Sequence, residues 1–191
     1  MNLTWDFGEL IGALVFAAER HRDQRRKDRF QTPYVNHLLA VVDILWNVGG
    51  ERDRDTLLAG VLHDIVEDTA TRESELAKRF GAAVAGIVAE VSDDKTLPKA
   101  ERKRLQVVQS PHKSAAARRV KIADATANVR DLVDNAPAGW SNERQLDYVR
   151  WARAVIAGIR DTSVQMECLF DESCSLAEAA IRERSEAPPT A

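Results

Sequence analysis

An apolar segment near residue 60 also carries an imidazole and three carboxylates, and this combination constrains the fold more than any other feature of the chain. Its apolar residues recur at helical spacing: Leu57, Leu58, Val61, Leu62 and Ile65. Its ionisable residues lie in the same stretch: His63, Asp64, Glu67 and Asp68. The spacing predicts a helix that buries one face. Because ionised groups near a buried face are unfavourable unless they are paired or bind a cation, the segment also predicts a metal site.

Two further predicted helices each carry one residue of a type that binds metals. His37 lies at the start of an apolar segment, and Asp124 lies among small and apolar residues. Alone, either could be structural, Asp124 for instance by pairing with Lys121. With His63 and Asp64 they form a set of two imidazoles and two carboxylates, which favours Mn²⁺, Fe²⁺, Zn²⁺ or Mg²⁺. We therefore interpret the four as ligands of one divalent cation, with positions left for water and substrate.

The remaining sequence predicts helices throughout, without a strand pattern of useful length. The expected apolar stripe of the first helix comprises Ile11, Leu14, Val15 and Ala18. Glycine, proline and capping residues predict three further helices at residues 73–80, 82–91 and 162–182. The predicted fold is all-α, with one helical-bundle domain over residues 1–184 and a disordered tail at 185–191.

Composition and charge limit the classes of molecule that the protein is expected to bind. The net charge of −3 argues against general nucleic-acid binding, although basic residues gather at positions 20–29 and 99–104. Such local clusters favour a small polyanion, which points to phosphates. The sequence shows neither a secretory signal nor an apolar run that would span a bilayer, so we expect a cytoplasmic protein without a membrane partner. Cys168 and Cys174 are expected to be reduced.

Longer motifs around the proposed ligands resemble those of one family. The motifs are Arg26-Lys27 followed by Thr-Pro-Tyr-Val-Asn-His37, then Leu-His-Asp-Ile-Val-Glu-Asp68, then Lys-Ile-Ala-Asp124 and Asn128. They resemble the hydrolase domain of the RelA/SpoT-type HD-domain phosphohydrolases. The likeness is closest to the stand-alone small alarmone hydrolases, including metazoan SpoT homologues, and it covers roughly residues 8 to 160.

The resemblance implies an HD-domain helical fold and a Mn²⁺-dependent hydrolysis of guanosine 3′,5′-bis(diphosphate) that releases pyrophosphate from the 3′ position. It also implies roles for eight residues besides the metal ligands. Glu67 and Asp68 would position or activate water and handle protons. The residues expected to contact the nucleotide are Arg26, Lys27 and Asn128, and those expected to contact phosphate or ribose are Lys99, Arg144 and Tyr148.

Simpler roles for some of these residues stay open at this point. Glu67 and Asp68 could only orient the metal ligands, Arg26 and Lys27 could be exposed helix-end cations, and Tyr148 could fill the core. Two other functions also stay open. The same metal site could remove the 2′-phosphate of NADPH, or the chain could be a catalytically silent nucleotide-binding module. The sequence makes no prediction of the oligomeric state.

Overall fold

Helices form all regular secondary structure in residues 5–186, the part of the chain that the computed structural model describes, apart from one isolated β-bridge between Arg25 and Pro33. The α-helices are α1 (Phe7–Arg20), α2 (Val35–Asp43), α3 (Arg54–Leu62), α4 (Ile65–Asp68), α5 (Glu73–Phe80), α6 (Ala82–Val91), α7 (Lys99–Gln109), α8 (Ala115–Asp134), α9 (Asn142–Ala157) and α10 (Val164–Glu186). A π-helix (Ile44–Val48) follows α2, and a 3₁₀-helix (Ser110–His112) follows α7. The predicted all-α class is confirmed.

Local chemistry explains where several helices begin and end. The Asp53 carboxylate caps α3 by accepting a hydrogen bond from a backbone N–H of the first turn, and the Ser141 hydroxyl caps α9 in the same way. Gly81 separates α5 from α6 with a φ of 102°, a conformation that favours glycine. The helices predicted at residues 73–80 and 82–91 are confirmed with the same bounds.

The buried face of α1 is not the predicted one. Ile11 and Val15 are 46% and 63% exposed, whereas Leu10, Ala13 and Phe16 are buried, and α1 packs on α3. Both sets of residues have helical spacing. The prediction is therefore wrong for Ile11 and Val15, whereas Leu14 is half-buried and packs against the core. Spacing within one helix does not tell which of two apolar faces meets a neighbouring helix.

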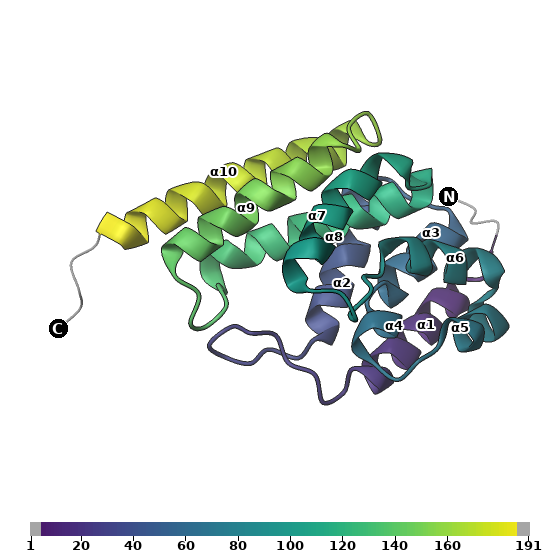
Figure 1. The fold of residues 1–191 in the computed structure, drawn as a ribbon. Coiled ribbons are helices and arrows are strands. Elements are labelled where there is room, and N and C mark those ends of the chain that lie inside the picture. Colours follow the sequence, from purple (N-terminus) through teal and green to yellow (C-terminus); the bar gives the residue numbers. More distant parts are fainter. Residues whose placement is uncertain (1–4, 187–191) are drawn as a thin grey trace.

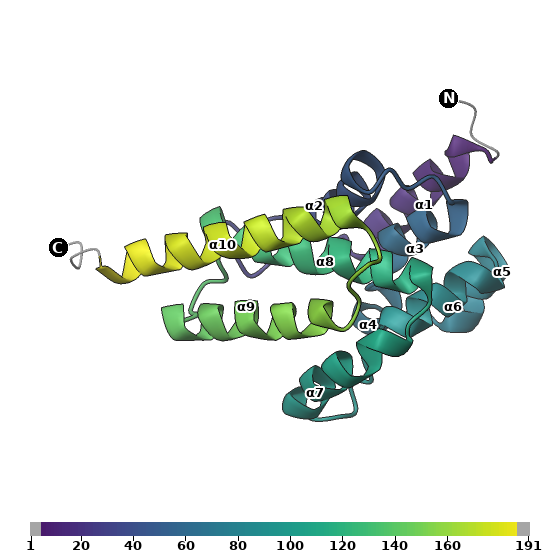
Figure 2. The ribbon, with the colours of Figure 1, turned by 90° about the horizontal axis from the view of Figure 1, so that it is seen from above.

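The long helix α8 lies at the centre of the fold. It packs against α2, α3 and α6, and also against α9 and α10, which run side by side along it (Figures 1 and 2). Val120, Ile122 and Val129 of α8 are fully buried. Full burial of an apolar side chain of this size stabilises a fold by about 1.5–3 kcal/mol. Because α8 also carries Asp124, this packing gives the proposed metal ligand a rigid support.

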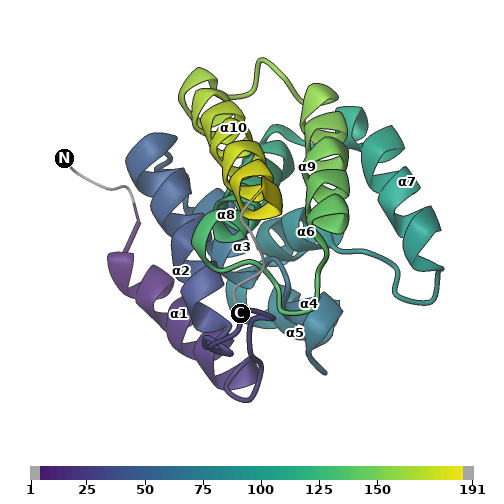
Figure 3. The same ribbon diagram turned by 90° about the vertical axis from the view of Figure 1, so that its left-hand side faces the viewer.

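The helix α7 is held more loosely than its neighbours. None of its residues is buried, and it extends from the other helices beside α9 (Figures 2 and 3). One hydrogen bond between the two helices runs from the Trp151 indole N–H to the Lys103 carbonyl oxygen, at 3.1 Å. This bond to a backbone carbonyl therefore helps to hold α7 beside α9.

The helix predicted through His63 and Asp64 is interrupted at these two residues, which separate α3 from α4. Asp64 has φ and ψ of −97° and −2°, and its carboxylate accepts a hydrogen bond from the Tyr34 hydroxyl. The prediction of one continuous helix is therefore wrong. The chain turns at Asp64, where the Tyr34 hydroxyl from a distant segment binds the carboxylate. The Asp68 N–H still donates to the Asp64 carbonyl oxygen at 2.8 Å, so α4 follows the turn directly.

The last helix is longer than predicted. Instead of covering residues 162–182, α10 runs over Val164–Glu186. The Ser185 hydroxyl donates to the Ile181 carbonyl oxygen at 2.9 Å and accepts from the Asn142 side chain at 2.7 Å. These bonds extend the helix past the expected start of a disordered tail at 185, and the rest of that tail, 187–191, lies outside the described residues. Within residues 5–186, no helix is both long and apolar enough to cross a bilayer.

Candidate active site

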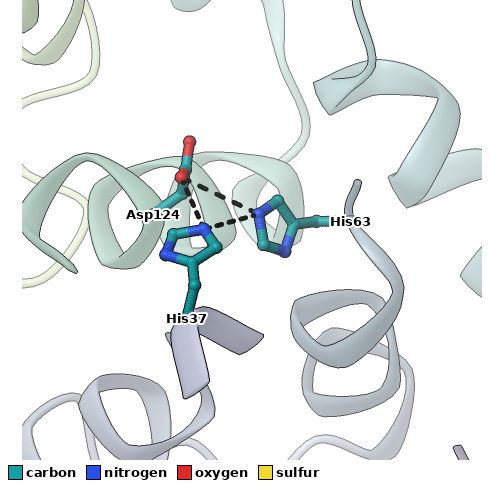
Figure 4. A group of neighbouring side chains, drawn as sticks. All are labelled: His37, His63 and Asp124. Carbon is teal, nitrogen blue, oxygen red and sulfur yellow. Dashed lines mark hydrogen bonds and ion pairs between the residues drawn. The ribbon is translucent and has the colours of Figure 1, made fainter. Parts of the chain in front are cut away.

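Three segments that are distant in sequence bring three potential metal ligands together. His37 lies in the first turn of α2, His63 directly follows α3, and Asp124 lies on α8 (Figure 4). The His37 Nε2 atom is 3.3 Å from both His63 Nε2 and Asp124 Oδ1, and His63 Nε2 is 3.7 Å from Asp124 Oδ1. These three ligand atoms all lie within 4.8 Å of one another, so one ion could contact all of them.

Asp64, the fourth predicted ligand, lies beside this cluster. Its Oδ2 atom is 2.9 Å from His63 Nε2 and 3.8 Å from His37 Nε2. The Tyr34 hydroxyl donates to the same oxygen and orients the carboxylate. The structure therefore gathers all four predicted ligands, with His37, His63 and Asp124 as the tighter group.

The orientation of these ligands suits a divalent cation. The His63 Nδ1 atom lies 2.9 Å from the Gly60 carbonyl oxygen, an acceptor that requires Nδ1 to carry the hydrogen. In the neutral imidazole the Nε2 lone pair then faces the cluster, as in histidines that bind metals. Asp124 is oriented similarly, because it accepts from Asn128 Nδ2 at 2.6 Å and from Lys121 Nζ at 3.1 Å. Two imidazole nitrogens and two carboxylates match the preferences of Mn²⁺, Fe²⁺ and Zn²⁺.

The buried charges of the cluster shift the pKa values of its members. Burial disfavours the charged form of His63, but Asp64 and Asp124 outweigh it and raise the pKa of His63 to about 9. Burial lowers the pKa of His37. Burial raises the pKa values of the two carboxylates, but the nearby cations outweigh it. His63 lowers the pKa of Asp64, and Lys121 with the histidines lowers the pKa of Asp124. In the metal-free protein near neutral pH, His63 is therefore protonated.

A pH dependence of metal binding follows from the protonation of His63. A cation must displace the His63 proton, so affinity should rise with pH below about 9, by up to tenfold per pH unit, and level off above it. His37 does not compete, because its pKa is lowered. Calorimetric titration with Mn²⁺ between about pH 6.5 and 8.5, in buffers of different ionisation enthalpy, measures the affinity and the protons released. An affinity independent of pH, without proton release, would contradict this prediction.

A cavity of about 390 Å³ opens next to the cluster, and both predicted catalytic carboxylates line it. Glu67 Oε2 accepts from the Asp93 N–H at 3.1 Å, and Glu67 Oε1 is 3.7 Å from Lys95 Nζ. Asp68 accepts from Gln24 Nε2 at 2.8 Å through one oxygen and from Lys95 through the other. Burial raises the pKa of Glu67, and the bond from Asp93 opposes this shift. Both oxygens of Asp68 thus accept a hydrogen bond, whereas Glu67 Oε1 has no contact shorter than 3.7 Å among the described residues.

A second cavity of about 330 Å³ collects the residues that the resemblance assigns to the nucleotide. Arg26, Lys27 and Asn128 line it, and Lys27 and Asn128 also line the cavity beside the metal cluster. Arg26 donates to Asn128 Oδ1 at 2.9 Å and to Asp131 Oδ2 at 2.5 Å. Arg26 is therefore largely enclosed and ion-paired, which excludes the alternative of an exposed helix-end cation.

A third cavity, of about 340 Å³, lies between α7 and α9 and contains Lys99, Arg144 and Tyr148. The Arg144 guanidinium lies 4.4 Å from the centre of the Trp140 ring. Burial together with the nearby cation Arg144 lowers the pKa of Lys99, as expected where positive charges crowd together. Tyr148 lines all three cavities. It therefore faces the candidate site and does not act as a core residue alone.

The sequence interpretation did not single out several residues of the site. Tyr34, which orients Asp64, is one of them, whereas Lys121 had been named as a possible partner of Asp124 and does donate to it. Tyr34 lies one helical turn before the predicted ligand His37, and this position was a usable signal. Asp93 and Asp131 gave no such signal, because a carboxylate in a loop or on an exposed helix face is common. Three further residues without a predicted role line the cavity beside the cluster: Lys95, Arg102 and Gln106.

Comparison with known proteins identifies the class of this fold and site. The model of the family described as "HD domain" matches residues 13–145. The chain therefore belongs to the HD domain family.

Its relatives within that family are hydrolases, and the chain is an enzyme of this class. It is 49% identical over 166 residues to guanosine-3′,5′-bis(diphosphate) 3′-pyrophosphohydrolase MESH1 of Xenopus tropicalis, covering 87% of this chain and 93% of that protein. It is 50% identical to the Homo sapiens protein of the same name over 159 residues, covering 83% and 89%. A solved structure of a metazoan orthologue of SpoT that hydrolyses ppGpp matches with a TM-score of 0.85 and 41% identity, over 96% of this chain and 99% of that chain.

Proposed function

We propose that this protein is a Mn²⁺-dependent guanosine-3′,5′-bis(diphosphate) 3′-pyrophosphohydrolase. The observation that carries the proposal is the identity of about half of all residues to relatives with this activity, across most of both chains. The buried His37, His63 and Asp124 cluster beside a cavity lined by cations and carboxylates supports it. The substrate is then a small nucleotide that bears two diphosphate groups.

His37, His63, Asp64 and Asp124 would hold the cation. When bound, a divalent cation would lower the pKa of a water molecule toward neutrality and offset phosphate charge. The protein supplies further positive charge, because Lys121 and Arg102 line the same cavity. Fixed cations of this kind stabilise the charge that develops on phosphate oxygens during phosphoryl transfer.

Glu67 is the residue that we assign to proton transfer. Its Oε1 atom has contacts no shorter than the 3.7 Å to Lys95 and Arg102 among the described residues, so it is available to the attacking water. Burial raises its pKa toward the operating pH, which favours a general base. Asp68, by contrast, has both oxygens engaged by Gln24 and Lys95. We assign Asp68 to positioning the loops and the water around Glu67.

The two remaining cavities would hold the rest of the nucleotide. Arg26, Lys27 and Asn128 line the cavity proposed for the guanosine, where Arg26 can contact phosphate or stack on a base. Lys99 and Arg144 line the more cationic cavity, which suits a phosphate group. Because Tyr148 lies where the three cavities meet, it is the residue best placed to contact the ribose.

Product analysis tests the proposed reaction directly. With Mn²⁺, the protein should convert guanosine 3′,5′-bis(diphosphate) into guanosine 5′-diphosphate and pyrophosphate, and a chelator should abolish the conversion. Chromatography of the nucleotides and an enzymatic assay of pyrophosphate measure both products. Incubation with NADPH under the same conditions is the comparison, because faster release of its 2′-phosphate would favour the phosphatase alternative. No metal-dependent product from either nucleotide would overturn the proposal.

A further inference from the structure

Glu67 is held by a chain of hydrogen bonds that begins on α7. Gln106, on the site-facing side of that helix, donates through Nε2 to both carboxylate oxygens of Asp93, at 2.8 and 2.9 Å. Arg102, one turn earlier, donates to Asp93 Oδ2 at 3.3 Å. The backbone N–H of Asp93 in turn donates to Glu67 Oε2 at 3.1 Å. The side chain of Asp93 thus fixes the loop between α6 and α7, and its backbone holds one oxygen of Glu67.

The chemistry of Gln106 leaves only one orientation for its amide. A carboxylate is an acceptor, so the NH₂ group must face Asp93 and the carbonyl oxygen must face away. In this orientation Gln106 Oε1 is buried without a hydrogen-bond partner among the described residues, and so is Arg102 Nε.

The hydrogen bonds from Gln106 through Asp93 constrain the position of the Glu67 side chain. α4, which carries Glu67, is a helix of four residues, and no residue of α7 is fully buried. The Glu67 side chain is 19% exposed and faces the cavity beside the metal cluster. Without the bond from Asp93, Glu67 would keep two contacts among residues 5–186, with the cations Lys95 and Arg102 at 3.7 Å, and both cations are on long side chains. The network therefore determines which Glu67 oxygen points into the cavity.

We propose that Gln106 is a positioning residue for Glu67, acting through Asp93. This inference rests on the proposed function, because it takes Glu67 as the group that accepts the proton of the attacking water. Gln106 touches neither the nucleotide nor the water in this account. It holds Asp93 so that the Asp93 N–H occupies Glu67 Oε2 and leaves Glu67 Oε1 free.

The variant Gln106→Leu tests the proposal, because it removes the NH₂ donor at similar volume. We expect kcat to fall about 10- to 100-fold, the range for a small misplacement of a catalytic group. KM should change less than about threefold, and bound Mn²⁺ should stay at the wild-type level. The matched control is Gln109→Leu, the same change at an exposed position of α7, which should keep the wild-type kcat.

The pH profile separates positioning from a purely structural role. The bond from the Asp93 N–H favours ionised Glu67, so its loss should raise the Glu67 pKa and move the acidic limb of the kcat profile to higher pH. The other ionisable groups that act on Glu67 are Asp64, the Asp93 carboxylate, Lys95 and Arg102, and none of them is replaced in this variant. Partial unfolding would instead reduce the active fraction with an unchanged profile, and that result would overturn the proposal.

A double-mutant comparison tests the path through Asp93. Asp93→Ala keeps the backbone N–H but removes the carboxylate, and it should lower kcat at least as much as Gln106→Leu. If the two residues act in series, adding Gln106→Leu to Asp93→Ala should cause little further loss. Additive losses, or a Gln106→Leu enzyme within about twofold of wild type, would overturn the proposal while the wild-type hydrolysis of the nucleotide stands. An inactive wild type would overturn the proposed function instead.

Discussion

Replacing His63 by alanine is expected to abolish stoichiometric Mn²⁺ binding and to reduce turnover by about 10³-fold or more. His63 Nε2 lies 3.3 Å from His37 Nε2 and 2.9 Å from Asp64 Oδ2, so it is in contact with most of the cluster. Its removal leaves too few ligands to enclose an ion. A metal centre typically contributes several kcal/mol to stabilising the transition state, and this corresponds to the expected loss of rate.

The His63→Ala measurement needs both metal content and rate. Atomic emission spectrometry gives Mn²⁺ per chain after gel filtration, and steady-state assays give kcat. The matched control is His112→Ala, which removes an exposed histidine of the 3₁₀-helix, and it should leave both quantities unchanged. A His63→Ala protein that keeps one Mn²⁺ per chain and the wild-type rate would refute the assignment of this cluster as the metal centre.

Replacing Glu67 is expected to separate metal binding from chemistry. Glu67→Ala and the isosteric Glu67→Gln should keep bound Mn²⁺, because Glu67 is not part of the His37, His63 and Asp124 cluster. Both variants should lower kcat by about 10²- to 10⁴-fold, the usual contribution of a positioned general base. The Gln variant can still accept the Asp93 N–H bond, so its loss reports proton transfer rather than misplacement.

The Glu67 variants are compared with a surface carboxylate. Glu73→Gln, at an exposed position of α5, makes the same chemical change far from the cavities and should keep the wild-type kcat. Mn²⁺ content, kcat and KM are measured for all variants. Wild-type turnover by the Glu67→Gln enzyme would show that another group accepts the proton, and Asp68, which lines the same cavity, would then be the next residue to replace.

Local sequence signals predicted the helices well, and they also indicated the metal cluster. The Asp53 and Ser141 caps and the glycine at position 81 define helix ends through contacts within a few residues. His63 and Asp64 stood out because ionisable side chains in an apolar segment need a partner. Their partners His37 and Asp124 stood out for the same reason, and the structure places all four side chains together.

The packing around α1 and the loop before α7 could not be predicted in the same way. Ile11 and Val15 have the spacing of a buried stripe, yet they are exposed because α3 packs on another face. Asp93 reaches Glu67 through a backbone N–H, a group that every residue except proline carries, so no pattern of residue types reveals it.

The amino-acid sequence by itself therefore determined the helical class, several helix ends and the kinds of side chain available for chemistry. These properties depend on contacts between residues near each other along the chain. Only the tertiary structure decided which face of α1 is buried, that Tyr34 orients Asp64, and that α7 holds Glu67 through Asp93. Such contacts join residues far apart in sequence, and the path of the loops and the packing of whole helices against one another determine them.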